Sequence, residues 1–565
     1  MGGKRLLAKN RYFAGLIITI TIKPRTNLRM SLFVKKPLSQ LLAQAGDSEK
    51  GLKRTLGATN LVALGVGAII GAGLFVRTAA AAAEAAGPAV TVSFIVAAIG
   101  CVFAGLCYAE FAAMIPIAGS AYTYAYATLG ELVAWIIGWA LIMEYALGAA
   151  TVSIAWSEYL NQLSRELFGG SIPYKWCHSP FEHINQVIGS TDITQFPADI
   201  AKTAKDGVLL LNDRQVDGLT AQLHSLVHVF HGTVNLPALV ILLLLSALLI
   251  KGTEESALVN GLIVAVKVAI VLVFIAVGWQ FIHHSNHVPY TIPAGTPGHE
   301  GFFKHGLGGI LGGAGIVFFA FIGFDAVSTA AQEAKNPKRD MPIGILGSLA
   351  VCTVLYILFS YVLTGVANWK EFELAGKEAS VTYAIKTYMI GYHWLATAVD
   401  VAILLGFSSV ILVMLLGQSR VFYTMSGDGL LPKVFSDLHP KFRTPYKSNM
   451  LLFLFVGAFA AFVPGSIAGD LTSFGTLFAF VLVSAGVWIM RRSNPEVERP
   501  FRTPWVPLVP ILGVVICLGM IVALDIHTLT AAFLWMIIGL IVYFAYSKRN
   551  SKLRPKGKLE KSAKP

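Results

Sequence analysis

Charged residues are scarce in this chain. Asp, Glu, Lys and Arg make up only 13% of its 565 residues, whereas 55% are hydrophobic, and the mean hydropathy is +0.67. A soluble domain carries about 25% charged residues, so this chain has too few to cover a surface that faces water. The shortage excludes an ordinary soluble enzyme or binding module and indicates an all-α protein that crosses a lipid bilayer several times.

Cysteine is scarce as well, with five residues in the whole chain. Four of them fall in apolar runs, and Cys177 stands alone in a polar stretch. No Cys-x-x-Cys pair and no regular cysteine framework occurs, which excludes a zinc ribbon and a disulfide-stapled domain. His178 and His183 lie near Cys177, but no second ligand pair follows them. We therefore expect no metal site and no cofactor.

Apolar runs are what the chain has in abundance. A helix crosses the hydrocarbon core with about 20 predominantly apolar residues. The sequence predicts twelve transmembrane helices on this criterion. They cover residues 58–84, 88–114, 131–161, 235–251, 255–283, 308–334, 342–366, 395–421, 449–465, 470–490, 506–524 and 528–547.

The net charge of +13 reflects 44 Lys and Arg residues, most of which lie in the two tails and in short connectors. This distribution is typical of membrane insertion and not of a patch that follows phosphates, so we expect no nucleic-acid partner. It predicts a multi-pass protein of the cytoplasmic membrane with both termini in the cytoplasm. The apolar piece 14–22 is too short to span, and Met30 is an alternative translation start to Met1.

Two of the predicted spans are rich in glycine. The first contains Gly65, Gly67, Gly71 and Gly73, and the sixth contains Gly306, Gly308, Gly309, Gly312, Gly313 and Gly315, followed by Phe321-Ile322-Gly323-Phe324-Asp325. Close helix packing is one explanation for either cluster. The two runs also open successive blocks of five spans, and glycine-interrupted helices at corresponding positions mark a transporter's substrate site.

A break in each of these helices would free polar backbone groups. The N–H groups near Gly71 and Gly73 would suit a carboxylate, and the carbonyls before each break would suit an ammonium. Together they describe an amino acid zwitterion.

Longer stretches around these breaks resemble the amino acid–polyamine–organocation superfamily, and within it the bacterial proton-coupled form of the cationic amino acid transporter branch. The matching text includes Gly67-Ala68-Ile69-Ile70-Gly71-Ala72-Gly73-Leu74-Phe75, Met143-Glu144-Tyr145, Gly323-Phe324-Asp325-Ala326-Val327-Ser328 and Gly417-Gln418-Ser419-Arg420. The resemblance covers about residues 50–545.

The resemblance implies a LeuT-like fold of two inverted five-helix repeats plus two C-terminal helices. The implied regions are a cytoplasmic N-terminal segment (residues 1–57), a first repeat 58–283 with an outer loop 162–234, a second repeat 308–490, two further helices 506–547 and a basic cytoplasmic tail 548–565. It also implies that the substrate carboxylate meets the backbone of Gly71, Ala72 and Gly73. The implied ammonium contacts are the carbonyls of Ile69, Phe319, Ala320 and Ile322, while Phe319 and Phe324 shape the pocket.

Lys267 lies 12 and 16 residues from the ends of the predicted span 255–283. These separations place it about 18 and 24 Å from the ends, too deep for its side chain to reach water. A lysine at this depth costs about 2.5–3.5 kcal/mol on insertion scales. Burial favours its neutral form, so it could carry the coupling proton, as the resemblance implies. The alternative is a structural cation that is held by backbone carbonyls.

Glu144 is equally deep in the third span. Its possible roles are a second proton site, a partner for a basic side chain and a structural acceptor. The resemblance favours a role in the substrate pocket.

The leading hypothesis is a secondary transporter that imports an amino acid with a proton by alternating access. An exchanger or an uncoupled facilitator on the same fold is the alternative, and a nutrient sensor or channel is less favoured. No span carries a nucleophile–base cluster, so we expect no enzyme. The charge balance of Lys267 and Glu144 leans toward a neutral substrate but leaves a cationic one open. The oligomeric state is open too, a monomer being the simplest case.

Overall fold

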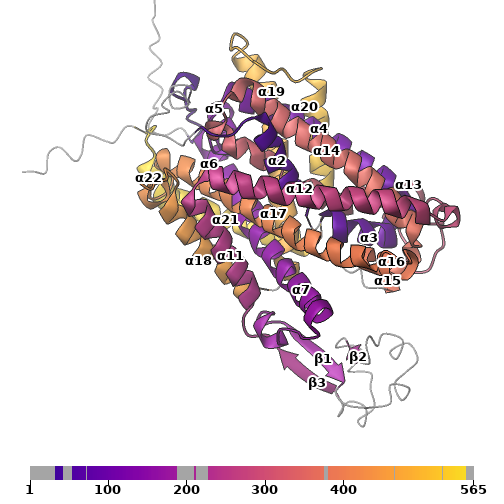
Figure 1. The fold of residues 1–565 in the computed structure, drawn as a ribbon. Helices are drawn as coiled ribbons and strands as arrows, with labels where there is room; N and C mark the ends of the chain where they lie inside the picture. Colours follow the sequence, from indigo (N-terminus) through magenta and orange to yellow (C-terminus); the bar gives the residue numbers. More distant parts are fainter. Residues whose placement is uncertain are drawn as a thin grey trace, which may run out of the picture.

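The computed structural model describes residues 32–41, 54–71, 73–187, 209–211, 227–374, 380–463, 465–522, 524 and 526–554. Helices dominate these ranges and pack side by side into one body, with a small sheet at one end (Figure 1). Most of the helices are apolar around their whole circumference. One side of each helix is buried against neighbouring helices, and the side that faces outward is apolar as well. Such helices are suited to lipid and not to water.

The helices follow the predicted runs closely. They are α2 (Ala58–Ile69), α3 (Thr78–Ala81), α4 (Val90–Met114), α5 (Ser120–Thr128), α6 (Glu131–Ile142), α7 (Gly148–Phe168), α11 (Leu236–Lys251), α12 (Thr253–Gly278), α13 (Gly306–Phe318), α14 (Pro337–Val366), α15 (Trp369–Leu374), α16 (Ser380–Tyr388), α17 (His393–Gly427), α18 (Tyr446–Phe462), α19 (Gly465–Ser493), α20 (Leu508–Val522), α21 (Ile526–Val542) and α22 (Lys548–Asn550). In the described residues, eight helical stretches are long and apolar enough to cross a membrane. The helices α2, α11, α18 and α20 are apolar but shorter.

The first predicted span is broken. Helix α2 ends at Ile69, Ile70 turns extended with ψ 102°, and helical structure resumes at Gly73 with a π-turn, Gly73–Arg77. Ala72, a predicted carboxylate contact, lies outside the described residues. The break therefore falls at Gly71 and Gly73, the two glycines from which we predicted it.

The sixth predicted span is broken too, at a single glycine. After α13 a 3₁₀ turn (Phe319–Phe321) follows, Ile322 is extended with ψ 135°, and Gly323 has φ +111°. Only glycine adopts that φ without strain. The segment after the break, Asp325–Glu333, is a 3₁₀ helix, although the predicted span 308–334 included it in a transmembrane helix.

The other glycines of this span do not interrupt it, which corrects the interpretation of the cluster. They lie inside α13, where four of them allow close packing. A Cβ on Gly309 would lie 2.2 Å from the carbonyl oxygen of Ala85, and one on Gly313 would lie 2.6 Å from Ser93 Oγ. Packing thus explains Gly308, Gly309, Gly312 and Gly313, whereas a Cβ on Gly306 or Gly315 would meet nothing within 4 Å; Gly323 marks the break.

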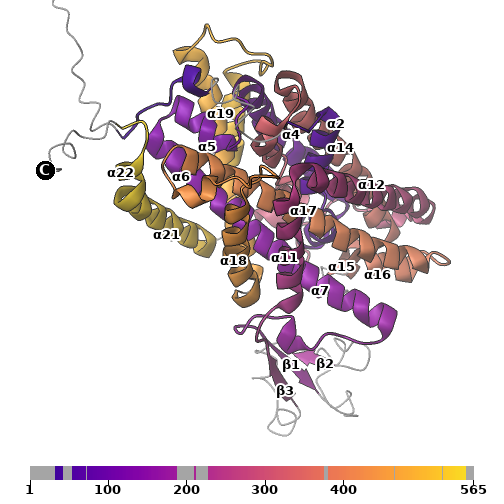
Figure 2. The ribbon, with the colours of Figure 1, turned by 60° about the vertical axis from the view of Figure 1, so that its left-hand side comes forward.

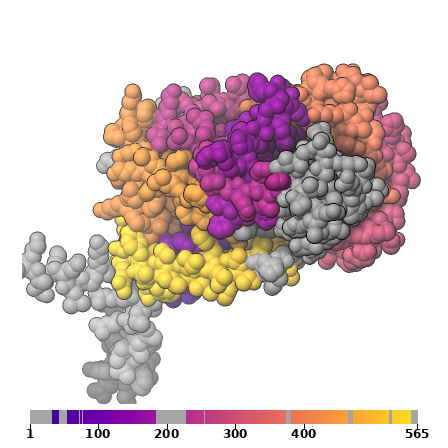
Figure 3. All heavy atoms as spheres, turned by 90° about the horizontal axis from the view of Figure 1, so that it is seen from below, coloured from indigo at the N-terminus to yellow at the C-terminus, as the bar shows by residue number. Residues whose placement is uncertain are grey.

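Long helices surround the two breaks. Helix α14 packs against α4 and α2, while α17 packs against α7, α12 and α2. Helix α21 lies along one edge of the body, as the yellow band in Figure 3 shows, and only 22% of its apolar stretch is buried in the molecule. Its outward side is therefore suited to lipid.

A portion of the predicted outer loop 162–234 is structured. Helix α7 continues to Phe168, beyond the predicted end of the third span. Three antiparallel strands follow in the order β2-β1-β3, with β1 (His183–Val187) between β2 (Leu209–Leu211) and β3 (Val227–His231). This sheet projects from the end of the body opposite to α22 (Figures 1 and 2).

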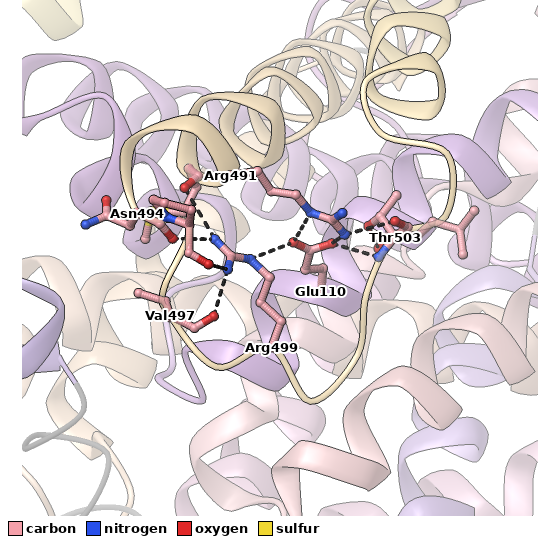
Figure 4. Close-up of polar contacts among 9 residues, drawn as sticks. Glu110, Arg491, Asn494, Val497, Arg499 and Thr503 are labelled. Atoms are coloured by element: carbon pink, nitrogen blue, oxygen red, sulfur yellow. Dashed lines mark hydrogen bonds and ion pairs between the residues drawn. The ribbon is translucent and has the colours of Figure 1, made fainter.

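A buried ion-pair cluster ties helices together at the end predicted to face the cytoplasm. The carboxylate of Glu110, at the end of α4, accepts hydrogen bonds from Arg491 Nε at 3.0 Å and Arg491 Nη2 at 2.7 Å (Figure 4). It also accepts from the backbone N–H of Thr503 at 2.7 Å, and Arg499 Nε lies 3.4 Å away. The cluster joins α4, α19 and the segment that leads to α20.

Candidate functional site

A cavity lies where the two breaks meet. Its lining comes from both broken helices and from α7, α17 and α19. The lining residues are Ala68, Ile69, Gly71, Gly73, Gly148, Val152, Phe319, Ile322, Val410, Met414 and Thr472. Apolar side chains and exposed backbone make up nearly all of this wall, and the Thr472 hydroxyl is its polar side chain. Such a lining suits a small molecule with a polar head and an apolar body.

The two breaks can approach so closely because both sides of the contact lack bulk. A Cβ on Gly73 would lie 2.2 Å from the Cα of Ala320, and a Cβ on Gly71 would lie 2.7 Å from Val410 Cγ2. Both distances are far shorter than a normal carbon–carbon contact of about 3.5–4.0 Å. Any larger residue would fill the cavity or push the breaks apart.

Lys267, on α12, supplies the hydrogen bonds that the end of α2 lacks. Its ammonium donates to the carbonyls of Gly67 at 3.0 Å and Ile70 at 2.7 Å and to Ser409 Oγ at 2.8 Å. Carbonyls in the last turn of a helix have no intrahelical donor, so a buried ammonium is a suitable partner. Lys267 thereby joins α12, α2 and α17 beside the break.

Tyr356, on α14, connects the two breaks directly. Its hydroxyl lies 2.9 Å from the carbonyl oxygen of Ile69 and 2.8 Å from that of Ala320. A hydroxyl has one hydrogen and can donate to only one of these carbonyls at a time. The carbonyls of Ile69 and Ala320, which we predicted to meet the substrate ammonium, therefore share this one donor. At any moment, one of the two carbonyls can accept a hydrogen bond from a different donor.

Glu144 lies in a π-turn (Met143–Leu147) that separates α6 from α7. Its carboxylate is fully buried next to Asp325 and Thr476, and neither of its oxygens has a hydrogen-bond partner among the described residues. Asp325 Oδ2 accepts a hydrogen bond from Tyr145 Oη at 2.6 Å. Two carboxyl groups in contact inside a membrane cannot both ionise cheaply, so the pair is a place where a proton can reside.

The structure brings most of the predicted site residues together. Those in the lining are Ile69, Gly71, Gly73, Phe319 and Ile322. Ala320 contributes its carbonyl to Tyr356 and stands outside the lining. Phe324 also lies outside the lining, because its ring packs against two other rings. The ring centroid of Tyr108 is 6.1 Å from that of Phe324, and the centroid of Phe480 is 4.9 Å from it.

Glu144 also lies outside the cavity lining, so the structure gives it carboxyl and hydroxyl neighbours in place of the predicted substrate contact. Sequence reasoning missed Ala68, Gly148, Val152 and Thr472, which together with Val410 and Met414 complete the wall. Nothing in their local sequence distinguishes them from ordinary packing residues.

Phe319 lines the cavity and has a charged neighbour on its ring. The guanidinium of Arg77 lies 5.3 Å from the centroid of the Phe319 ring, within the range of a cation–π interaction. Arg77 therefore places a positive charge behind this part of the cavity wall.

Long apolar helices, two of them broken around a cavity, and a match to a permease family over most of the chain define a multi-pass membrane protein of the transporter class and not an enzyme. The chain belongs to the amino acid permease family, whose model matches residues 56–546. This agrees with the superfamily that the sequence motifs resembled.

Individual relatives are similar over nearly the whole chain. A branched-chain amino acid permease of Bacillus subtilis is 41% identical over 93% of this chain and 100% of its own length. A methylthioribose transporter of the same species is 38% identical over 93% of this chain and 99% of its own. The vacuolar cationic amino acid transporter 4 of Arabidopsis thaliana is 31% identical over 82% of this chain and 68% of its own. Amino acid transport is thus the activity that the family and its members support.

Proposed function

We propose that the chain imports a neutral, aliphatic amino acid together with a proton by alternating access. The observation that carries this proposal is the cavity at the two helix breaks, which combines free backbone groups with an apolar wall. The backbone groups suit a zwitterion, and the wall suits an aliphatic side chain.

The head group of the substrate would lie against the breaks. Its carboxylate would meet the N–H groups of the 71–73 segment, where α2 has ended and the next helical turn begins. Its ammonium would meet the carbonyls of Ile69, Phe319, Ala320 and Ile322, displacing or sharing the hydroxyl of Tyr356. A methyl-sized group at Gly71 or Gly73 would occupy the same space.

The rest of the cavity supports a neutral side chain. Val152, Ile322, Val410 and Met414 offer no counter-charge to a basic group. Arg77 above Phe319 adds a positive charge on the access side, which would repel a cationic side chain and attract a carboxylate. The name of the 41% identical relative, a branched-chain amino acid permease, points in the same direction.

Lys267 is our candidate for the coupling proton. As an ammonium it has three hydrogens for its three acceptors, whereas a neutral amine has only two. Loss of the proton would release one acceptor and weaken the tie between α2 and its neighbours on α12 and α17. Because α2 carries one half of the cavity, this change would couple proton release to movement of the site. Glu144 with Asp325 would form a second proton site.

The overall arrangement that we propose follows from the family. The twelve predicted spans would form two inverted five-helix repeats, 58–283 and 308–490, plus the helices of 506–547. Both termini would be cytoplasmic and the protein would reside in the cell membrane. The position of the β1–β3 sheet and of α22 at opposite ends of the body supports this sidedness.

One observation favours an uncoupled facilitator or exchanger as the second candidate. The three partners of Lys267 would equally suit a permanently charged lysine that only holds α2 in place. In that case transport would run without a proton.

Uptake into proteoliposomes separates these possibilities. We expect radiolabelled leucine to accumulate when the outside is acidified by one pH unit, up to about tenfold for one proton per substrate. Arginine and methylthioribose serve as the comparison substrates. Leucine uptake that only equilibrates would support the facilitator, uptake that requires internal amino acid would support the exchanger, and accumulation of arginine but not leucine would refute the substrate assignment.

A further inference from the structure

A second, smaller cavity lies nearer to the end of the body predicted to face the cytoplasm. It is enclosed by α2, α11, α12 and α17 and by the end of the 3₁₀ helix Asp325–Glu333. The residues that line it are Leu56, Leu64, Leu249, Ser256, Ala257, Glu333, Leu412, Val413 and Leu416. Its wall is almost wholly aliphatic, with one carboxylate.

That carboxylate is only half satisfied. Glu333 is fully buried, and its Oε1 accepts a hydrogen bond from Arg420 Nε at 2.5 Å. Its second oxygen, Oε2, has no hydrogen-bond partner among the described residues. Arg420 Nη2 is likewise buried without a partner in the portion of the chain that the structure describes. Buried polar groups are nearly always hydrogen-bonded, so a free oxygen and a free guanidinium nitrogen on one ion pair need an explanation. Of the two residues, Glu333 is in the cavity wall and Arg420 lies behind it.

The two free groups have opposite charges and sit on one ion pair. A zwitterionic head group would satisfy both, its ammonium donating to Glu333 Oε2 and its carboxylate accepting from Arg420 Nη2. Neither the ion pair nor the zwitterion has net charge, so binding would leave no uncompensated charge in the membrane. The aliphatic wall would receive the side chain. We propose that this cavity is a second binding site for the transported amino acid.

The second site follows the first along the predicted route to the cytoplasm. Ala68 of α2 and Met414 of α17 line the first cavity, whereas Leu64 and Leu416 line the second. Four residues along α2 correspond to a shift of about 6 Å. An amino acid leaving the first cavity could therefore reach Glu333 after moving by roughly its own length. This site rests on the proposed function and extends it, since it would hold the substrate just before release.

Backbone pairing closes the second cavity in this structure. The N–H groups of Thr55 and Leu56 donate to the carbonyl of Glu333 at 2.9 and 3.0 Å, and Lys335 N–H donates to Leu56 O at 2.8 Å. The enclosed space has room for about one water-sized molecule. Occupation by an amino acid therefore requires the start of α2 to move away from Glu333, as it would when the inner side opens.

Accessibility of a cysteine in the second cavity tests the proposal. Ser256→Cys places a thiol in its wall, and Leu258→Cys on the same helix is the matched control because Leu258 is 77% exposed on the outer surface of the body. A membrane-impermeant thiol reagent is applied from either side of vesicles that contain the full chain, with the parent protein as background. We expect labelling of Ser256→Cys from the cytoplasmic side and little labelling of the control.

Protection by leucine then identifies the occupant. Leucine at about ten times its Kd would slow labelling about tenfold. We expect this protection to persist when Gly71→Ala blocks the first cavity and to vanish when Glu333→Gln is added, which keeps the acceptor for Arg420 but removes the free oxygen. Met414→Trp is a second way to fill the first cavity should Gly71→Ala fold poorly.

Three results would overturn the proposal. Failure of the reagent to label Ser256→Cys would mean that the cavity does not open to the cytoplasm. If leucine no longer protects Ser256→Cys once Gly71→Ala or Met414→Trp fills the first cavity, all leucine binding belongs to the first cavity. The proposed function would then remain intact. A lack of protection even without a blocking substitution would refute both the second site and leucine as the substrate.

Discussion

Replacing Lys267 by methionine separates its structural role from its role in coupling. The substitution removes the donors to the carbonyls of Gly67 and Ile70. The carbonyl of Gly67 still accepts a hydrogen bond from Ser409 Oγ at 2.8 Å, so the loss is one buried acceptor, that of Ile70, at a cost of about 1–3 kcal/mol. Against this stands the cost of about 2.5–3.5 kcal/mol for keeping a lysine in the membrane, which the variant no longer bears. The net effect should therefore lie between a loss of about 0.5 kcal/mol and a gain of about 2.5 kcal/mol in stability, so we expect a folded protein.

Coupling, in contrast, should be lost completely. The wild type should accumulate leucine up to about tenfold for each unit of pH difference at one proton per substrate. Lys267→Met should equilibrate leucine without accumulating it. Lys267→Arg should behave in the same way, because a guanidinium holds its proton permanently.

Ser409→Ala is the matched control in the proteoliposome assay. It removes one acceptor of the ammonium, at 2.8 Å, and leaves the titratable lysine in place. Accumulation should therefore survive in Ser409→Ala. If Lys267→Met still accumulates leucine as the wild type does, the lysine is a structural cation and the coupling proton lies elsewhere.

Further substitutions test the cavity, the ion-pair cluster and the outer loop. Gly71→Ala should abolish leucine uptake into proteoliposomes, because its Cβ would lie 2.7 Å from Val410 Cγ2 in the first cavity. Adding Val410→Ala should restore uptake, whereas uptake by the single variant would place the transport site elsewhere. Glu110→Gln should lower the free energy of unfolding by about 3–5 kcal/mol, as the buried partner of Arg491 is lost, and an unchanged thermal midpoint would contradict this. Burial lowers the pKa of His287, so the folded protein favours the neutral imidazole. The stability that the neutral imidazole contributes is present above the unperturbed histidine pKa of about 6.5 and is lost as the pH falls below that value. Hydrogen exchange around residues 284–287 should therefore quicken with acid in the wild type, and the same acid response in His287→Gln would rule this histidine out.

The sequence predicted the helices and the first break well, for local reasons. Each span is a run of apolar residues long enough to be seen by itself, and the glycines at 71 and 73 weaken the helix at the position where it ends. The second break was harder to place, because α13 contains six glycines, four of which serve close packing, while the chain turns at Gly323 beyond them. The sequence alone does not distinguish a glycine that allows close helix packing from one that allows a turn in the backbone.

The wall of the cavity was predicted only partially, because it depends on contacts between distant segments. Thr472 and Gly148 reach the cavity through the packing of α19 against α7, which no local pattern indicates. Tyr356 looks like one more aromatic residue of an apolar run, yet its hydroxyl joins the two breaks. The depth of Lys267 and Glu144 in their spans was evident from the sequence, whereas their neighbours, Ser409 and Asp325, became visible only in the folded chain.

A structure of the protein determined with L-leucine tests the central claim most directly. We expect the carboxylate of leucine at the backbone N–H groups of residues 71–73, its ammonium at the carbonyls of Ile69 and Phe319, and its side chain between Val152 and Met414. Leucine bound only outside this cavity, or a cavity that stays empty at saturating leucine, would contradict the account.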